Sequence, residues 1–311
     1  MTFKRILLII LTLLAVAGGI VGFAFVSLPP VEPLKKRSCN MTIPVKDWQG
    51  NYHPFVVGPK NPYWTGSRSI PAEMKWSVIL AEDASFYKHD GIDVKAIKKA
   101  IQYDLEKQSL ARGASTITQQ TAKNLFLSRE KSISRKIREV ILAKRMEQEL
   151  TKGRILELYL NVVELGPMVY GIGHGARFYF GKSAALLTPR ESTFLAAMLP
   201  GPRVAFNPYR DVDKVMKRSD LILKLLRKRG VLTEEEYQRA LAETPNIAGL
   251  QRKVDASIKK EEAFPNRSSV MGPALPAVGS GEELPAREES GEAVREAEPK
   301  EGEARPEAER K

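Results

Sequence analysis

The sequence predicts a mainly α-helical fold, in which a helical globular domain follows an N-terminal transmembrane helix. Three observations lead to this prediction. Residues 6–28 form an uncharged run of 23 residues. From Pro71 to about residue 242, apolar residues recur at helical spacing between capping signals. Strand-like alternation is nearly absent, so no large sheet is expected.

The run at residues 6–28 is long enough to cross a hydrocarbon core of about 30 Å. A cleaved signal peptide is the alternative, because Lys4 and Arg5 precede the run. The apolar part of such a peptide normally has only about 7–15 residues. We therefore expect an uncleaved single-pass anchor. Lys4 and Arg5 favour residues 1–5 as a cytoplasmic N-terminus, while Lys35, Lys36 and Arg37 after the run weaken that signal.

The remainder of the chain divides by composition. Residues 29–54 are rich in proline and lack periodic pattern, which indicates a linker. Residues 55–250 form the helical domain. Residues 251–311 lose their apolar positions to Glu, Pro, Ala, Gly and Arg, a composition that predicts a disordered charged tail.

Three helix starts can be predicted from capping chemistry. Asp93 precedes an apolar-periodic segment and is a candidate N-cap. Thr188 with Glu191, and Thr233 with Glu236, have the spacing of capping boxes. These signals support a succession of separate helices.

The net charge of +12 is unevenly distributed. From residue 272 onward, eleven glutamates face six basic residues, so the preceding chain is strongly basic. Such a body suits anionic lipids, diphosphates or nucleic acid, and the predicted anchor favours lipid over nucleic acid. The single cysteine, Cys39, excludes an intrachain disulfide.

One helix predicted at residues 132–150 carries Arg135 and Glu139 four residues apart, with Lys131 one turn earlier. The same face becomes apolar further along, which suggests that the helix enters the core near Glu139. An exposed ion pair is the alternative explanation.

The stretch RGASTITQQTAKNLF carries hydroxyls and amides where a surface helix normally carries Lys and Glu. Ser115, Gln119 and Gln120 could bind sugar hydroxyls, and Lys123 adds a cation nearby. An ordinary polar helix face is the alternative explanation.

Glu82 and Asp83 are adjacent carboxylates at the end of an apolar helix. Leu80 and Phe86 flank them, so Glu82 could be desolvated enough to act as a general base. Asp83 should instead bond to the turn at His89. A solvated helix end is the alternative explanation.

The chain resembles the peptidoglycan glycosyltransferases, in particular the monofunctional biosynthetic transglycosylases, over roughly residues 55–240. The motifs that carry the resemblance occur in order: Glu82-Asp83-x-x-Phe86-x-x-His89-x-Gly91, Gly113-x-Ser115-Thr116-Ile117-Thr118-Gln119-Gln120, Arg135-Lys136-x-x-Glu139, Ile155-Leu156-Glu157-x-Tyr159-Leu160-Asn161 and Tyr179-Phe180-Gly181-Lys182.

The resemblance implies a lysozyme-like helical glycosyltransferase domain that polymerises lipid II by inverting transfer and releases undecaprenyl diphosphate. Glu82 would be the general base, and Glu139 a second catalytic residue that orients cations and is a candidate ligand for Mg²⁺ or Mn²⁺. We expect no organic cofactor. The implied substrate-binding residues are Ser115, Gln119, Gln120, Lys123, Lys131, Arg135 and Arg138.

The resemblance also implies a location in the bacterial inner (cytoplasmic) membrane, with the catalytic domain on the periplasmic or outer face. Expected partners are lipid II, the growing glycan strand and membrane lipids; cell-division or elongation proteins are candidates, and nucleic acid is not expected. Two alternative functions stay open: a lytic enzyme on the same fold, and a non-catalytic cell-wall scaffold.

Overall fold

The computed structural model describes residues 3–26, 28–47, 49–107, 115–128, 130 and 132–248. Lys131 and the predicted tail at 251–311 lie outside the described residues. The helices are α1 (Phe3–Val26), α2 (Ala72–Glu82), α3 (Val94–Lys107), α4 (Ile117–Phe126), α5 (Ile133–Glu149), α6 (Lys152–Val162), α7 (Ile172–Phe180), α8 (Pro189–Met198), α9 (Val212–Lys228) and α10 (Glu234–Ala242). The mainly α prediction is confirmed.

Two small antiparallel pairs of strands accompany the helices. They are β1 (Met41–Lys46) with β2 (Tyr52–Val57), and β3 (Glu164–Gly166) with β4 (Val169–Tyr170). Within the described residues these pairs make up all of the sheet structure.

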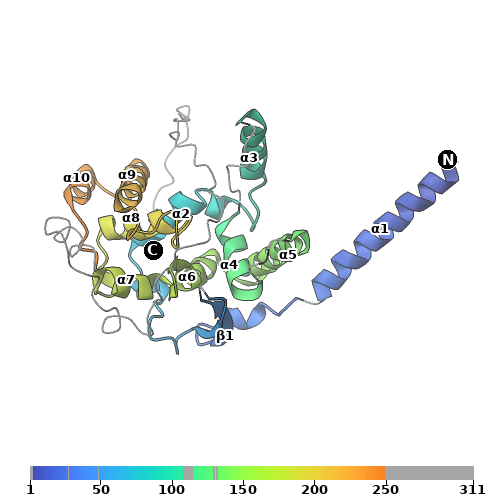
Figure 1. Ribbon diagram of the computed structural model, residues 1–311, viewed down its shortest axis with the longest axis horizontal. Helices are drawn as coiled ribbons and strands as arrows, with labels where there is room; N and C mark the ends of the chain where they lie inside the picture. The colour runs from blue at the N-terminus through green and yellow to red at the C-terminus, as the bar shows by residue number, and fades with distance from the viewer. Residues whose placement is uncertain are drawn as a thin grey trace, which may run out of the picture.

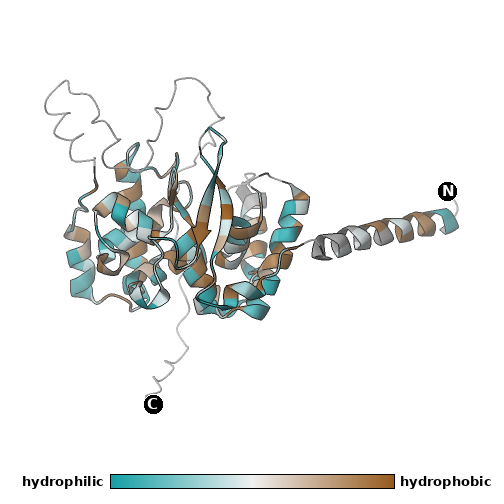
Figure 2. Ribbon diagram, turned by 90° about the horizontal axis from the view of Figure 1, so that it is seen from below, coloured by the Kyte–Doolittle hydropathy of each residue, from teal (hydrophilic) through white to brown (hydrophobic). Residues whose placement is uncertain are grey.

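Helix α1 contacts α5 and extends away from the rest of the body as an arm (Figures 1 and 2). Among the residues that the structure describes, no helix has the combination of length and apolar character required of a membrane span. The transmembrane helix predicted at residues 6–28 therefore stays a prediction.

The core is built around α6 and α8, whose residues are almost all buried. Helix α2 contacts α8 and α9, while α4 contacts α5 and α6. Figure 1 shows α8, α9 and α10 on one side of the body and α4 and α5 on the other. The end of α2 and the start of α4 come from these two sides. They meet at the acidic pair Glu82 and Asp83, where Asp83 contacts Ile117.

Local capping chemistry explains where several helices begin. Capping boxes at Thr188 and Thr233 start α8 and α10, as predicted. Asp93 accepts a hydrogen bond from the backbone N–H of Ala96 at 2.8 Å and so caps α3, also as predicted. A third capping box, at Thr116, starts α4 and was missed in the sequence.

Residues 29–54, which the composition suggested to be a linker, are partly built into the body. Val31 and Leu34 are buried, and the buried Arg154 side chain donates to the backbone carbonyl of Leu34 at 2.8 Å. Strand β1 directs Ile43 and Val45 into the core. Prolines obscured this pair of strands in the sequence, because Pro44 in β1 lies directly opposite Pro54 in β2.

Candidate active site

Glu82 is the last residue of α2, where the chain leaves helical geometry at Asp83. Its side chain is 13% exposed, and its Oε2 atom accepts a hydrogen bond from Gln120 Nε2 at 3.0 Å. Burial raises the pKa of Glu82 above its ordinary value, against the opposing effects of the Gln120 hydrogen bond and the Arg218 and Lys123 charges. A carboxylate with a raised pKa is suited to accept a proton near neutral pH.

The Gln120 amide is itself oriented by Tyr159. The Tyr159 hydroxyl donates to Gln120 Oε1 at 3.1 Å, which turns the NH₂ group towards Glu82. Burial, followed by the charges of Glu82 and Asp83, raises the pKa of Tyr159 well above its ordinary value. Tyr159 therefore remains a hydroxyl donor, and the chain of contacts from α6 through α4 fixes the Glu82 carboxylate.

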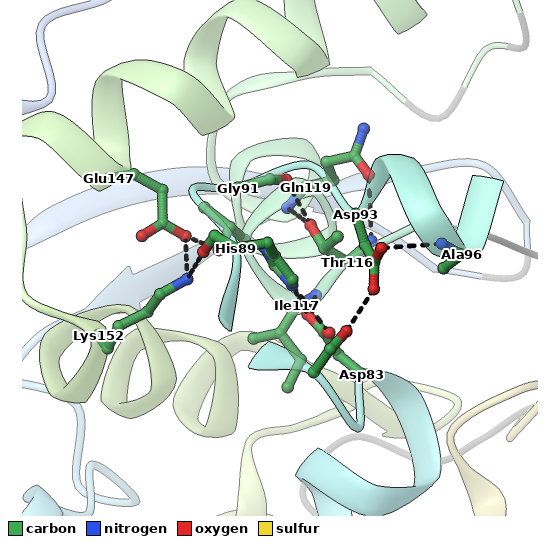
Figure 3. A network of polar contacts seen from close by, with 12 residues as sticks. Asp83, His89, Gly91, Asp93, Ala96, Thr116, Ile117, Gln119, Glu147 and Lys152 are labelled. Atoms are coloured by element: carbon green, nitrogen blue, oxygen red, sulfur yellow. Dashed lines mark hydrogen bonds and ion pairs between the residues drawn. The ribbon is translucent and has the colours of Figure 1, made fainter. Parts of the chain in front are cut away.

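Asp83, next to Glu82, has a different role. Its carboxylate contacts His89 Nε2 at 2.9 and 3.1 Å and accepts from the backbone N–H of Ile117 at 3.0 Å (Figure 3). Ile117 is the first residue of α4, so Asp83 supplies negative charge at a helix N-terminus. The predicted bond to the His89 turn is confirmed. Asp83 joins the end of α2 to the start of α4, next to Glu82.

A second buried pair holds the same loop from the other side. Lys152 Nζ contacts Glu147 Oε1 at 2.7 Å and donates to the backbone carbonyl of His89 at 2.6 Å (Figure 3). The same atom lies 4.5 Å from the centre of the Phe86 ring. Thr118 on α4 donates to the same Glu147 oxygen at 2.5 Å. The loop that follows Glu82 is thus tied to α4, α5 and α6.

Gln119 takes part in the capping box of α4. Its Oε1 accepts from the backbone N–H of Thr116 at 3.1 Å, and the residue is 2% exposed. The Thr116 hydroxyl also donates to the backbone carbonyl of Gly91 at 2.7 Å (Figure 3). The structure therefore places Gln119 in a structural contact, and its predicted contact with substrate stays a prediction.

Glu139, in the middle of α5, is a second buried carboxylate. Its Oε2 pairs with Arg135 Nη1 at 2.7 Å and its Oε1 with Lys136 Nζ at 2.5 Å. Lys136 also donates to Ser115 Oγ at 3.0 Å, which connects α5 to the residue just before the α4 cap. Because Glu139 is only 3% exposed, the exposed ion pair considered for the sequence does not describe it.

A cavity of about 790 Å³ lies between α4 and the two pairs of strands. Glu82 does not line it, but its hydrogen-bond partner Gln120 does. Lys123 and Arg135 bring positive charge to the wall. Other lining residues include Lys46, Tyr52, Phe55, Asn124, Glu164 and Tyr170.

The predicted site residues fall into two groups. Glu82, Gln120 and Lys123 come together at the end of α2, and Ser115, Arg135 and Glu139 come together through Lys136. Arg138 is half-buried on α5, and Lys131 lies outside the described residues.

Three residues of the site were not predicted: Lys136, Tyr159 and Arg218. Lys136 has the i,i+3 spacing to Glu139 that indicates an ion pair. Tyr159 occurs in one of the family motifs, where a buried hydroxyl needs a partner. Arg218 had no local signal, because it lies on α9, far from Glu82 in sequence.

The ligand sets that hold divalent metals in proteins include His, Cys, Asp and Glu side chains. No group of three or more such side chains gathers among the described residues, and both oxygens of Glu139 are engaged by cations. The described geometry therefore supports no step that passes through a metal, and the Mg²⁺ or Mn²⁺ near Glu139 stays a prediction.

A largely buried carboxylate with a raised pKa, near a cation-lined cavity in a helical domain, is typical of an enzyme active site that binds an anionic substrate. The family model for the transglycosylases matches residues 53–227, and the chain belongs to that family. The family membership expected from the motifs is confirmed.

Two relatives illustrate the similarity. The chain is 44% identical to the biosynthetic peptidoglycan transglycosylase of Nitrosomonas eutropha over 163 residues. This alignment covers 52% of this chain and 66% of that protein. It is 36% identical to penicillin-binding protein 1A of Escherichia coli, over 78% of this chain and 28% of that protein. The chain thus spans about a quarter to two thirds of the length of these relatives.

A crystal structure of penicillin-binding protein 1A from Haemophilus influenzae is also similar. The match covers 72% of this chain and 25% of that one, with 19% sequence identity and a TM-score of 0.36.

Proposed function

We propose that this chain is a peptidoglycan glycosyltransferase that polymerises lipid II into glycan strands, with Glu82 as the general base. The observation that carries the proposal is the Glu82 environment: a buried carboxylate with a raised pKa, fixed by Gln120, beside a cavity lined by Lys123 and Arg135. Its family membership and the names of its relatives agree with this activity.

In the proposed reaction, Glu82 removes the proton from the 4-hydroxyl of the acceptor N-acetylglucosamine. The hydroxyl oxygen bonds to the anomeric carbon of the donor N-acetylmuramic acid with inversion, and the bond from that carbon to the diphosphate breaks. Undecaprenyl diphosphate leaves as an anion. Lys123 and Arg135 stabilise its developing negative charge.

The surroundings of Glu139 favour transfer over hydrolysis. A glycoside hydrolase needs a second carboxylic acid to protonate a poor leaving group. Arg135 and Lys136 occupy both oxygens of Glu139, which suits a carboxylate that positions cations and not a proton donor. A diphosphate leaving group needs positive charge more than it needs a proton.

We place the enzyme in the bacterial inner membrane, anchored once through residues 6–28, with its catalytic domain on the periplasmic or outer face. Lipid II presents its sugars at that surface, and the basic body suits anionic lipid head groups. Protein partners in division or elongation are part of the same proposal.

The test is polymerisation of purified lipid II by detergent-solubilised protein, followed on gels, with Glu82→Gln alongside and finished peptidoglycan as an alternative substrate. Polymer from the wild type alone supports the proposal. Release of fragments from finished peptidoglycan, without polymer from lipid II, would establish the lytic alternative. Inactivity on both substrates would favour the scaffold.

A further inference from the structure

Arg218 lies on α9, a helix outside every segment that carries a predicted site residue. Its Nη2 atom is 3.8 Å from Glu82 Oε1. The guanidinium lies 5.4 Å from the centre of the Phe206 ring, and the side chain is 31% exposed. Its Nε atom is buried and has no hydrogen-bond partner within the described part of the chain.

The two oxygens of Glu82 have different surroundings. Oε2 accepts the Gln120 hydrogen bond at 3.0 Å, whereas Oε1 faces Arg218 at 3.8 Å, which is too long for a hydrogen bond. Arg218 therefore supplies charge to Oε1 without taking up its lone pairs. Oε1 remains the oxygen to which an incoming hydroxyl can donate.

The charged and titratable groups that face Glu82 come from several elements. Asp83 follows it in sequence, Lys123 lies on α4, Tyr159 on α6 and Arg218 on α9. Of the two cations, Lys123 lines the cavity, whereas Arg218 is not among the cavity-lining residues. Arg218 therefore lies where it can act on the Glu82 carboxylate but not on a ligand in the cavity.

We propose that Arg218 is a positioning residue of the active site, whose guanidinium rests against Phe206, balances the charge of the buried Glu82 carboxylate and leaves Glu82 Oε1 open to the acceptor hydroxyl. The inference rests on the proposed role of Glu82 as general base. Arg218 thereby acts through Glu82 and not on the sugar. Its loss should change kcat and the pH profile but leave KM nearly unchanged.

The first experiment measures kcat/KM for lipid II against pH in the wild type, Arg218→Met and Arg218→Lys. Removal of the positive charge should move the acidic limb upward by about one pH unit, since a cation within about 4–6 Å favours the ionised carboxylate. Arg218→Lys should restore most of the wild-type profile. Arg227→Met is the matched control, because Arg227 lies on the same helix and pairs with Glu234 at the surface.

An unshifted limb in Arg218→Met, with only a uniform loss of rate, would overturn the inference and leave Arg218 a structural role. A shift of equal size in Arg227→Met would also overturn it, because the effect would then belong to the general charge of α9.

A second experiment does not depend on activity. The cost of Arg218→Met in unfolding free energy is measured in the wild type and again together with Glu82→Gln, as a double-mutant cycle. The inference predicts a larger cost when Glu82 is present, and equal costs would overturn it. If the wild type forms no polymer, the proposed function fails, while this cycle still decides whether Arg218 acts on Glu82.

Discussion

The two buried glutamates of the site have opposite surroundings. Glu82 has one neutral hydrogen-bond donor and a cation 3.8 Å away, whereas Glu139 has a cation within 2.7 Å of each oxygen. Burial raises the pKa of the Glu82 carboxylate, because these contacts offset the desolvation only in part, and one oxygen stays open. The second neutralises the carboxylate and occupies both oxygens. The comparison shows that the contacts of an acidic side chain, and not its burial alone, determine whether one of its oxygens is left for an incoming hydroxyl.

The largest expected effect comes from Glu82→Gln, which keeps the shape of the side chain but removes its ability to accept a proton. Loss of a general base typically costs about 10²–10⁴-fold in rate, and we expect kcat for lipid II polymerisation to fall by this amount. Circular dichroism should show an unchanged fold. If the variant polymerises lipid II at the wild-type rate, Glu82 is not the general base and does not differ from Glu139 in this respect.

Glu139→Gln should act mainly on stability, because it leaves Arg135 and Lys136 without their anion. Breaking a fully buried pair costs about 3–5 kcal/mol. Lys136 reaches solvent, so we expect about 2 kcal/mol in urea unfolding. Glu149→Gln is the control on the same helix, since the exposed Glu149 pair with Lys35 should contribute less than about 1 kcal/mol. Equal losses in the two variants would contradict the tight ion pairing of Glu139.

The third prediction concerns pH. Because burial raises the pKa of Glu82, the folded protein takes up a proton there more readily than the unfolded chain. Its contribution to stability is greatest at acid pH and is lost as the pH rises through the raised pKa. Activity has the opposite sign and should fall about tenfold per pH unit below that pKa.

Thermal unfolding across pH checks the stability part of this prediction. Glu82→Gln should melt above the wild type at about pH 8. The gap should narrow as the pH falls through the ordinary glutamate pKa and close by about pH 3, where Glu82 is protonated in both folded and unfolded chains. A gap that does not vary with pH would show that Glu82 is not desolvated.

Much of this site could be predicted from local sequence, and the remainder depended on the tertiary fold. Glu82 and Glu139 were identifiable because their neighbours along the chain are informative, and helix starts at Thr188 and Thr233 followed from three-residue capping patterns. Arg218 could not be found in this way, because only the contact of α9 with α2 brings it near Glu82. Gln119 shows the converse, since its polar side chain is used by its own helix.

The smallest expected effect comes from Tyr159→Phe, which removes the hydroxyl that orients the Gln120 amide. Loss of one buried hydrogen bond should cost about 1 kcal/mol in unfolding free energy. Without the hydroxyl, the Gln120 amide can rotate and turn its oxygen towards Glu82, so we expect a several-fold lower kcat with little change in KM.

Tyr179→Phe is the matched control for this last variant. The Tyr179 hydroxyl is equally buried and donates to the backbone carbonyl of Leu165 at 2.7 Å, without contact to Gln120. The two variants should lose similar stability, measured by urea unfolding, but only Tyr159→Phe should lose activity. If both lose activity to the same extent, rigidity of the core accounts for the effect. In that case the specific orientation of Gln120 does not explain why Glu82 differs from Glu139.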